Sequence, residues 1–134
     1  MEYYAHTAAE SDGTPILDTA KWQLLSTHLR SVAELAEWFA GPLGLAAEGQ
    51  TVGLLHDLGK YRAEFRQYLH KERKAGSDTH HAIYGAAHAF TSEWLPQAFA
   101  IAGHHAGLPD QHDLCGTVQG EKYDAVERAK GLLA

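Results

Sequence analysis

The apolar positions between residues 18 and 40 recur at intervals of three and four, which is the pattern of an amphipathic helix. They are Trp22, Leu25, Leu29, Val32, Ala33, Ala36, Phe39 and Ala40. Asp18 or Thr19 can cap the start of this helix, and the Gly41-Pro42 pair can end it. We therefore expect one helix over residues 18–40, after an ordered lead-in that ends in a turn.

His28 lies on the apolar face of this helix, three residues after Leu25 and four before Val32. Its side chain should therefore point into the core. The spacing alone favours a hydrogen-bonded core histidine over a metal ligand. His6, in the lead-in, has two roles that the sequence does not separate: it could support the ligands of a site, or it could be an ordinary hydrogen-bonded histidine.

The most informative stretch covers residues 52–60, Val-Gly-Leu-Leu-His-Asp-Leu-Gly-Lys. It predicts a helix over residues 50–58. Three leucines indicate that this helix is buried: Leu54, Leu55 and Leu58. His56 and Asp57 are neighbours within it, and a buried imidazole and carboxylate without partners would cost several kcal/mol. Both are common ligands of divalent transition metals, so a metal ion is the simplest partner.

Lys60 follows Asp57 by three residues and His56 by four, so helical spacing would bring it to the same face. A lysine beside a metal site can hold a substrate phosphate and stabilise charge that develops during the reaction. The alternative is a solvated lysine in the last helical turn, where the helix dipole favours a cation. The sequence favours neither role over the other.

Four further helices are predicted, over residues 61–74, from 78 to about 94, from 96 to about 103, and over 123–133. In the first of these, apolar side chains should face inward: Phe65, Tyr68 and Leu69. Charged side chains should face outward: Arg62, Glu64, Arg66, Lys71, Glu72, Arg73 and Lys74. Between residues 110 and 120 the chain is polar and the helical pattern fades. No strand alternation appears, so we expect an all-α fold.

Histidines gather at the ends of two predicted helices. His81 opens the helix that runs to about residue 94. His104 and His105 end an apolar helix and precede a Gly-Leu-Pro turn, so they can converge on one ion or on the two edges of a two-metal site. His88 shares the helical face of His81 but lies two turns away, roughly 10 Å, which is too far to share an ion. We expect His88 to be structural.

Composition narrows the classes of protein. With 134 residues, of which 45% are hydrophobic, the chain is long enough for one domain with a core. No segment approaches the roughly 18 consecutive apolar residues of a membrane span, and the start lacks the pattern of a signal peptide, so we expect a cytoplasmic protein. Cys115 is the only cysteine, which excludes an internal disulfide and a thiolate metal cluster. The net charge of −6 argues against binding of nucleic acid by general electrostatics.

Five motifs together resemble the HD nuclease domain of the type I CRISPR-associated helicase-nuclease. They are Tyr-Ala-His near the start, Trp22 through His28-Leu29, residues 54–60, His81-Ala-Ile-Tyr-Gly-Ala, and Gly103-His104-His105-Ala-Gly-Leu-Pro. The His-Asp pair is shared by all HD phosphohydrolases, whereas the paired histidines with Gly-Leu-Pro are more specific to the CRISPR branch. The resemblance implies an HD-domain helical bundle with a metal site in its centre.

The resemblance also implies a role for each site residue. Two ligand sets would share Asp57: His28, His56 and Asp57 for one ion, and His81, His104 and His105 for the other. Lys60 would face the scissile phosphate. The enzyme would be a metal-dependent endonuclease that cleaves single-stranded DNA, with a helicase domain or subunit and the Cascade surveillance complex as partners. Five imidazoles and one carboxylate suit two ions of Mn, Fe, Co, Ni or Zn better than Mg, which prefers oxygen ligands.

This chain departs from the family in one respect. In the family, the first metal takes a further aspartate from a helix downstream of the paired histidines. The downstream aspartates of this chain do not lie in that context: Asp110, Asp113 and Asp124. We therefore expect residues 1–134 to be a single HD nuclease domain in a truncated or short form, with an incomplete first site. Two alternatives stay open. One is an HD phosphohydrolase for a nucleotide, which needs a closed pocket for base and ribose. The other is a catalytically weak docking module for a helicase partner, which has no need of tightly bound metal.

Overall fold

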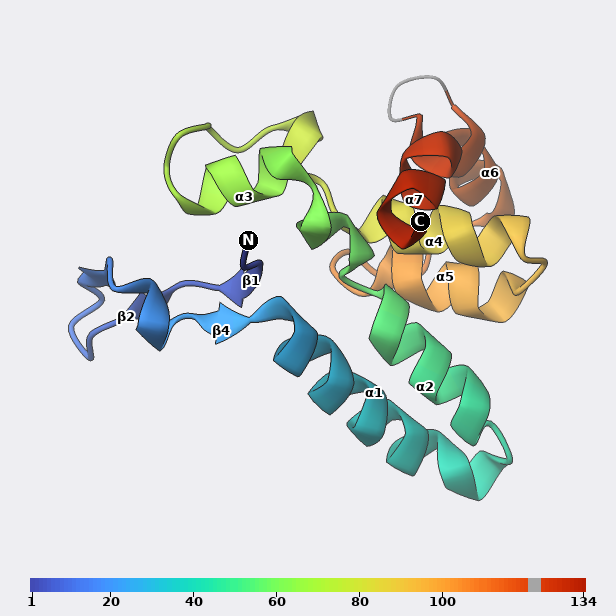
Figure 1. The fold of residues 1–134 in the computed structure, drawn as a ribbon. Coiled ribbons are helices and arrows are strands. Elements are labelled where there is room, and N and C mark those ends of the chain that lie inside the picture. Colours follow the sequence, from blue (N-terminus) through green and yellow to red (C-terminus); the bar gives the residue numbers. More distant parts are fainter. Residues whose placement is uncertain (121–123) are drawn as a thin grey trace.

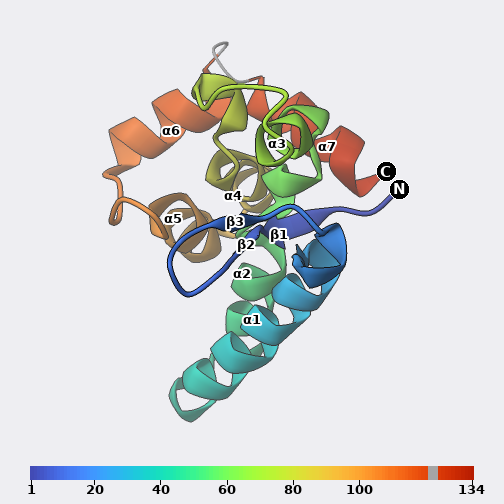
Figure 2. The ribbon, with the colours of Figure 1, turned by 90° about the vertical axis from the view of Figure 1, so that its left-hand side faces the viewer.

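The computed structural model describes residues 1–120 and 124–134. Helices dominate it, which confirms the all-α prediction: α1 Leu25–Ala40, α2 Ala46–Leu55, α3 Ala63–Leu69, α4 Ala82–Thr91, α5 Leu95–Gly103, α6 Gln111–Gln119 and α7 Ala125–Leu133. Short 3₁₀ helices connect some of them: η1 Thr19–Lys21, η2 Gly41–Leu43, η3 Leu58–Tyr61 and η4 Ser77–Thr79. The longest of the described helices, α1, packs against α2 as an antiparallel hairpin that extends away from the other helices (Figures 1 and 2).

The segment before α1 contains short strands, which the sequence pattern did not predict. They are β1 Tyr4–His6, β2 Ala8–Ala9, β3 Pro15–Ile16 and β4 Gln23–Leu24, paired antiparallel as β1 with β4 and β2 with β3. Because β4 pairs with β1, the helix predicted from residue 18 begins only at Leu25. Asp18 caps η1 instead, where its carboxylate accepts a hydrogen bond from the backbone N–H of Ala20. Trp22 is still buried, packed against Tyr4.

Helix α4 is the centre of the main core. It contacts α5, α6, α7 and η3, and these elements gather around it in Figure 1. Its buried residues are mostly small, which lets the neighbouring backbones approach: Ile83, Tyr84, Gly85, Ala86, Ala87 and Ala89. A Cβ on Gly85 would overlap the carbonyl oxygen of Leu55, and a Cβ on Gly59 would overlap the backbone of His81. These two glycines therefore bring the end of α2 and the segment after it against the start of α4.

In the first part of the chain, the exposure of several side chains and the length of one helix differ from the predictions. Leu55 and Leu58 are buried as expected, but Leu54 is 43% exposed because it lies on the outer side of α2. The helix predicted over 61–74 is shorter, since α3 ends at Leu69, and Tyr68 is 37% exposed. Arg62 was expected to face outward but is buried, where its guanidinium donates hydrogen bonds to the Tyr84 hydroxyl and the Glu64 carboxylate.

The last part of the chain is more helical than the sequence pattern indicated. Residues 111–119 form α6, in the region where the pattern fades, because the Asp110 carboxylate accepts a hydrogen bond from the backbone N–H of Asp113 and caps the helix. Buried Leu114 and Val118 then join the core. The predicted helix over 123–133 appears as α7, and Tyr123 lies outside the described residues. No described helix combines the length and the apolar character that crossing a bilayer requires.

Substitution of Gly85 should test the close approach of α2 and α4. We expect Gly85→Ala to lower the free energy of unfolding by about 1 to 3 kcal/mol or more, because the added methyl group meets the backbone of Leu55, which cannot move aside cheaply. Gly116→Ala in α6 is the matched control, since its Cβ meets nothing within 4 Å and alanine is the better helix former. Urea denaturation of both variants makes the comparison. Equal stability of the two would contradict the packing described.

Candidate metal centre

Asp57 occupies the junction between α2 and η3. Helix α2 ends at Leu55, and His56 still donates its backbone N–H to the Val52 carbonyl, 2.9 Å away. Asp57 then leaves helical geometry, with φ −111° and ψ 19°, before η3 begins at Leu58. Neighbouring side chains on a continuous helix point about 100° apart. The break allows the side chains of His56 and Asp57 to approach one another, with 3.3 Å between Nε2 and Oδ2.

One carboxylate oxygen of Asp57 faces the first predicted ligand set. Oδ2 lies 3.1 Å from Nε2 of His28, which comes from α1, and 3.3 Å from Nε2 of His56. The two Nε2 atoms are themselves 3.1 Å apart. These three donor atoms come from α1, the end of α2 and the turn after it, so the hairpin brings them together.

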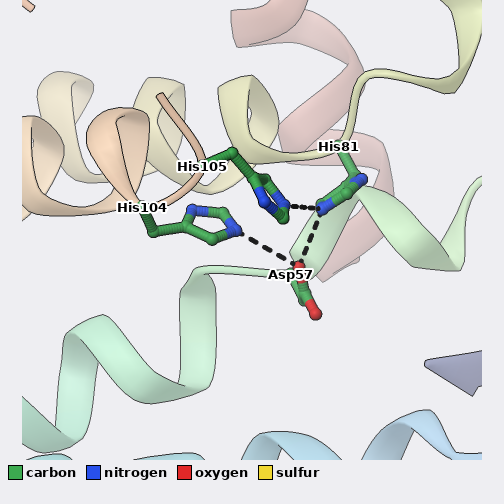
Figure 3. Close-up of side chains that lie close together, drawn as sticks. All are labelled: Asp57, His81, His104 and His105. Atoms are coloured by element: carbon green, nitrogen blue, oxygen red, sulfur yellow. Dashed lines mark hydrogen bonds and ion pairs between the residues drawn. The ribbon is translucent and has the colours of Figure 1, made fainter. Parts of the chain in front are cut away.

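The other oxygen faces the second predicted set, shown in Figure 3. Oδ1 lies 3.0 Å from Nε2 of His81, just before α4, and 3.6 Å from Nε2 of His104, just after α5. Nε2 of His105 is 2.7 Å from Nε2 of His81. The five predicted histidine ligands thus lie together around the Asp57 carboxylate.

Two of the imidazoles are oriented by backbone carbonyls. Nδ1 of His56 lies 2.7 Å from the carbonyl oxygen of Gly53, and Nδ1 of His104 lies 2.7 Å from that of Ile101. A carbonyl can only accept, so Nδ1 must be the protonated nitrogen that donates. In the neutral ring Nε2 then carries the lone pair, which points at Asp57. This is the usual way in which proteins orient histidine ligands for a metal.

The titration of these groups follows from their burial and their neighbours. Burial by itself raises the pKa of the Asp57 carboxyl, but its imidazole and ammonium neighbours outweigh burial and hold that pKa far below its usual value. Burial lowers the pKa of His28 and His105, which keeps both rings neutral at pH 7. Burial also lowers the pKa of His104, but the Asp57 carboxylate and the Ile101 carbonyl outweigh burial and raise that pKa above its usual value.

The arrangement fits divalent metal ions. Asp57 is only 2% exposed, and its Oδ1 accepts no hydrogen bond from the described part of the chain. A buried carboxylate oxygen without a donor is costly unless a cation satisfies it. Donor atoms about 2.1 Å from one ion lie roughly 3.0 to 3.4 Å from one another. The donor atoms of each set lie within 4.8 Å of one another, and most of the distances above fall near that range.

Comparison with known families agrees with this geometry. The family model of the HD domain matches residues 25–130, which is most of the chain. The chain belongs to the HD domain family. HD domains bind divalent metals, and membership indicates a metal-dependent phosphohydrolase. A search among curated proteins finds no match to this chain.

Lys60 is part of the interior of this HD domain. Its side chain is 4% exposed, which rules out the solvated lysine considered above. The ammonium donates to Oδ2 of Asp57 at 2.8 Å and to the carbonyl oxygen of Ala5 at 3.1 Å, and it lies 5.4 Å from the centroid of the Phe65 ring. Lys60 therefore ties Asp57 to β1, a strand that precedes the region matched by the HD model.

Other histidines lie around the ligands. The His6 ring in β1 meets the His28 ring edge to face, with centroids 5.2 Å apart. His88, on α4, packs against Trp94, which immediately precedes α5. Among the residues that the structure describes, none of the downstream aspartates lies with either ligand set: Asp110, Asp113 and Asp124.

Removal of the Asp57 charge should destabilise the metal-free protein. Asp57→Asn leaves the Lys60 ammonium buried without a counter-charge, so we expect the free energy of unfolding to fall by about 3 to 5 kcal/mol. Adding Lys60→Met removes the unpaired ammonium and should restore most of the lost free energy of unfolding. Urea denaturation in EDTA measures both variants. If the double variant is no more stable than Asp57→Asn, the unpaired Lys60 ammonium is not the cause of the lost stability.

Proposed function

We propose that this HD domain is a metal-dependent nuclease that cleaves single-stranded DNA in CRISPR interference, as the HD nuclease of a type I CRISPR-associated helicase-nuclease. The observation that carries the proposal is the single buried carboxylate shared by two histidine sets. Oδ2 of Asp57 faces His28 and His56, and Oδ1 faces the histidines at the ends of α4 and α5. The motif resemblance that singled out these residues supports the nuclease branch over other HD phosphohydrolases.

The proposed function assigns a different role to each group of site residues. The six ligands would hold two divalent ions, of which Mn, Fe, Co and Ni suit five imidazoles and one carboxylate best. When bound there, the two ions would supply Lewis-acid chemistry for water activation and for stabilising the charge on the phosphate. Asp57 would bridge the two positions. Lys60 fixes the Asp57 carboxylate and adds a positive charge behind it, so its effect on a scissile phosphate would be through Asp57 and the local field.

The net negative charge of the chain indicates that a nuclease of this kind would depend on a partner to bind DNA. A net charge of −6 leaves little general attraction for the phosphate backbone of DNA. A nuclease with this surface needs its substrate delivered. A helicase domain or subunit, recruited by the Cascade surveillance complex, would supply single-stranded DNA and much of the affinity for it.

A nucleotide phosphohydrolase is the second candidate, and one observation favours it. A cavity of about 580 Å³ borders the second ligand set, lined in part by His81 and His105. The volume lies within the usual range of small-molecule sites. A free nucleotide could place its phosphate at the ligands and its base in this cavity. Hydrolysis of mononucleotides without cleavage of DNA would select this candidate.

Cleavage of circular single-stranded DNA tests the proposed nuclease. We expect nicking and degradation with Mn²⁺, Ni²⁺ or Co²⁺, and none with EDTA. Asp57→Ala should lower the rate about 10³-fold or more, because it removes the ligand shared by both sets. His88→Ala is the matched control, since His88 packs on Trp94 and belongs to neither ligand set, and it should keep wild-type activity.

The outcomes separate the candidates. Loss of cleavage in Asp57→Ala and not in His88→Ala supports the nuclease. Failure of the folded wild type to cleave with any of the three metals would overturn it. Tight metal binding in such an inactive protein would leave the nucleotide phosphohydrolase, and absence of metal binding would leave the docking module.

A further inference from the structure

The cavity beside the second ligand set has apolar walls. It lies where α4, α5 and α6 meet, and its volume is about 580 Å³. Seven of its lining residues are alanine, isoleucine, leucine or valine: Ala82, Ile83, Ala86, Ala102, Ala106, Leu114 and Val118. Helix α6 closes one side through the last two of these, which are almost fully buried. An apolar hollow of this kind attracts a flat, uncharged group rather than a phosphate.

The same cavity reaches the candidate metal ligands. His81 and His105 line it, and their Nε2 atoms meet 2.7 Å apart beside Oδ1 of Asp57. Figure 3 shows these two rings next to the carboxylate, one from the start of α4 and one from the end of α5. A molecule with a phosphate at the ligands could therefore place an attached ring system in the cavity. Imidazole rings can also stack on a nucleobase.

The rim of the cavity carries polar groups that a base could use. Asp113 and Thr117, both on exposed positions of α6, contribute to its lining. Asp113 is held in place through its backbone N–H, which donates to the Asp110 carboxylate. A carboxylate at the rim repels a second phosphate. It accepts hydrogen bonds from the exocyclic amino group of cytosine, and by the same chemistry from other base N–H groups.

We propose that this cavity is a base-binding subsite, which takes the nucleobase next to the reacting phosphate and favours a base with an exocyclic amino group. The role of this subsite in DNA cleavage rests on the proposed nuclease. The binding of a nucleobase in the cavity can be tested whether or not the protein is a nuclease. The subsite would select among nucleotides at one position of a single strand. It would also explain how a chain with net negative charge engages a nucleic acid locally, through one base rather than through many phosphates.

Binding without metal tests the subsite separately from catalysis. In EDTA, titration of the ¹⁵N-labelled protein with deoxycytidine monophosphate should shift amide signals from α4, α5 and α6. Deoxyribose 5-phosphate, the same molecule without its base, should shift them far less. Ala102→Leu fills the cavity and should weaken binding of the nucleotide about 10-fold or more. Gly116→Ala, which does not line the cavity, is the matched control and should bind as the wild type does.

A second variant keeps the test informative if Ala102→Leu fails to fold. Asp113→Ala changes only an exposed rim residue, and it should reduce the preference for deoxycytidine monophosphate over thymidine monophosphate by about 2- to 10-fold. Equal shifts with the nucleotide and with deoxyribose 5-phosphate would overturn the subsite, as would shifts confined to residues that neither line the cavity nor belong to these three helices.

A cleavage assay tests the subsite independently of the binding experiment. With Mn²⁺, an oligonucleotide that carries one abasic position should lose the cut beside that position, and Ala102→Leu should raise KM while the protein still binds Mn²⁺. Unchanged cutting at abasic positions would overturn the subsite while the nuclease stands. Base-dependent binding in EDTA, from a protein that cleaves no DNA, would retain the subsite and overturn the nuclease.

Discussion

The buried carboxylate of Asp57 is the interaction on which the rest of the site depends. Its two oxygens face opposite ways, one toward His28, His56 and Lys60 and the other toward His81 and His104. A carboxylate that is 2% exposed and surrounded by imidazoles and an ammonium stays ionised, and its pKa lies far below the usual value even though burial opposes this. One residue thus links all the segments that bring a histidine to the centre.

The scaffold achieves this convergence by close backbone contact. Gly59 and Gly85 let the α2–η3 junction press against α4, which brings His56 and His81 to the same carboxylate. The N-terminal strand completes the arrangement, because the Ala5 carbonyl shares the Lys60 ammonium with Asp57. The region that matches the HD family begins at residue 25, so this support comes from a segment before it.

The sequence predicted where the candidate ligands lie better than it predicted their surroundings. Spacing placed histidines at the ends of apolar helices, the family resemblance added His28, and the donor atoms of each set lie close together. The start of α1 was misplaced because β1–β4 pairing is a contact between distant segments, which periodicity along one helix does not register. Arg62 was placed outside because its buried partner, Tyr84, comes 22 residues later. Helix α6 depends on a cap at Asp110 more than on an apolar stripe, so its pattern was weak.

The number of divalent ions bound per chain tests the shared carboxylate most directly. Protein loaded with Mn²⁺ and freed of excess metal would be analysed for manganese content and by electron paramagnetic resonance. Two ions per chain with a spin-coupled spectrum, both lost together in Asp57→Asn, are the expected result, since Asp57 would bridge them. Two uncoupled ions, or two ions retained in Asp57→Asn, would contradict a site built on one shared carboxylate.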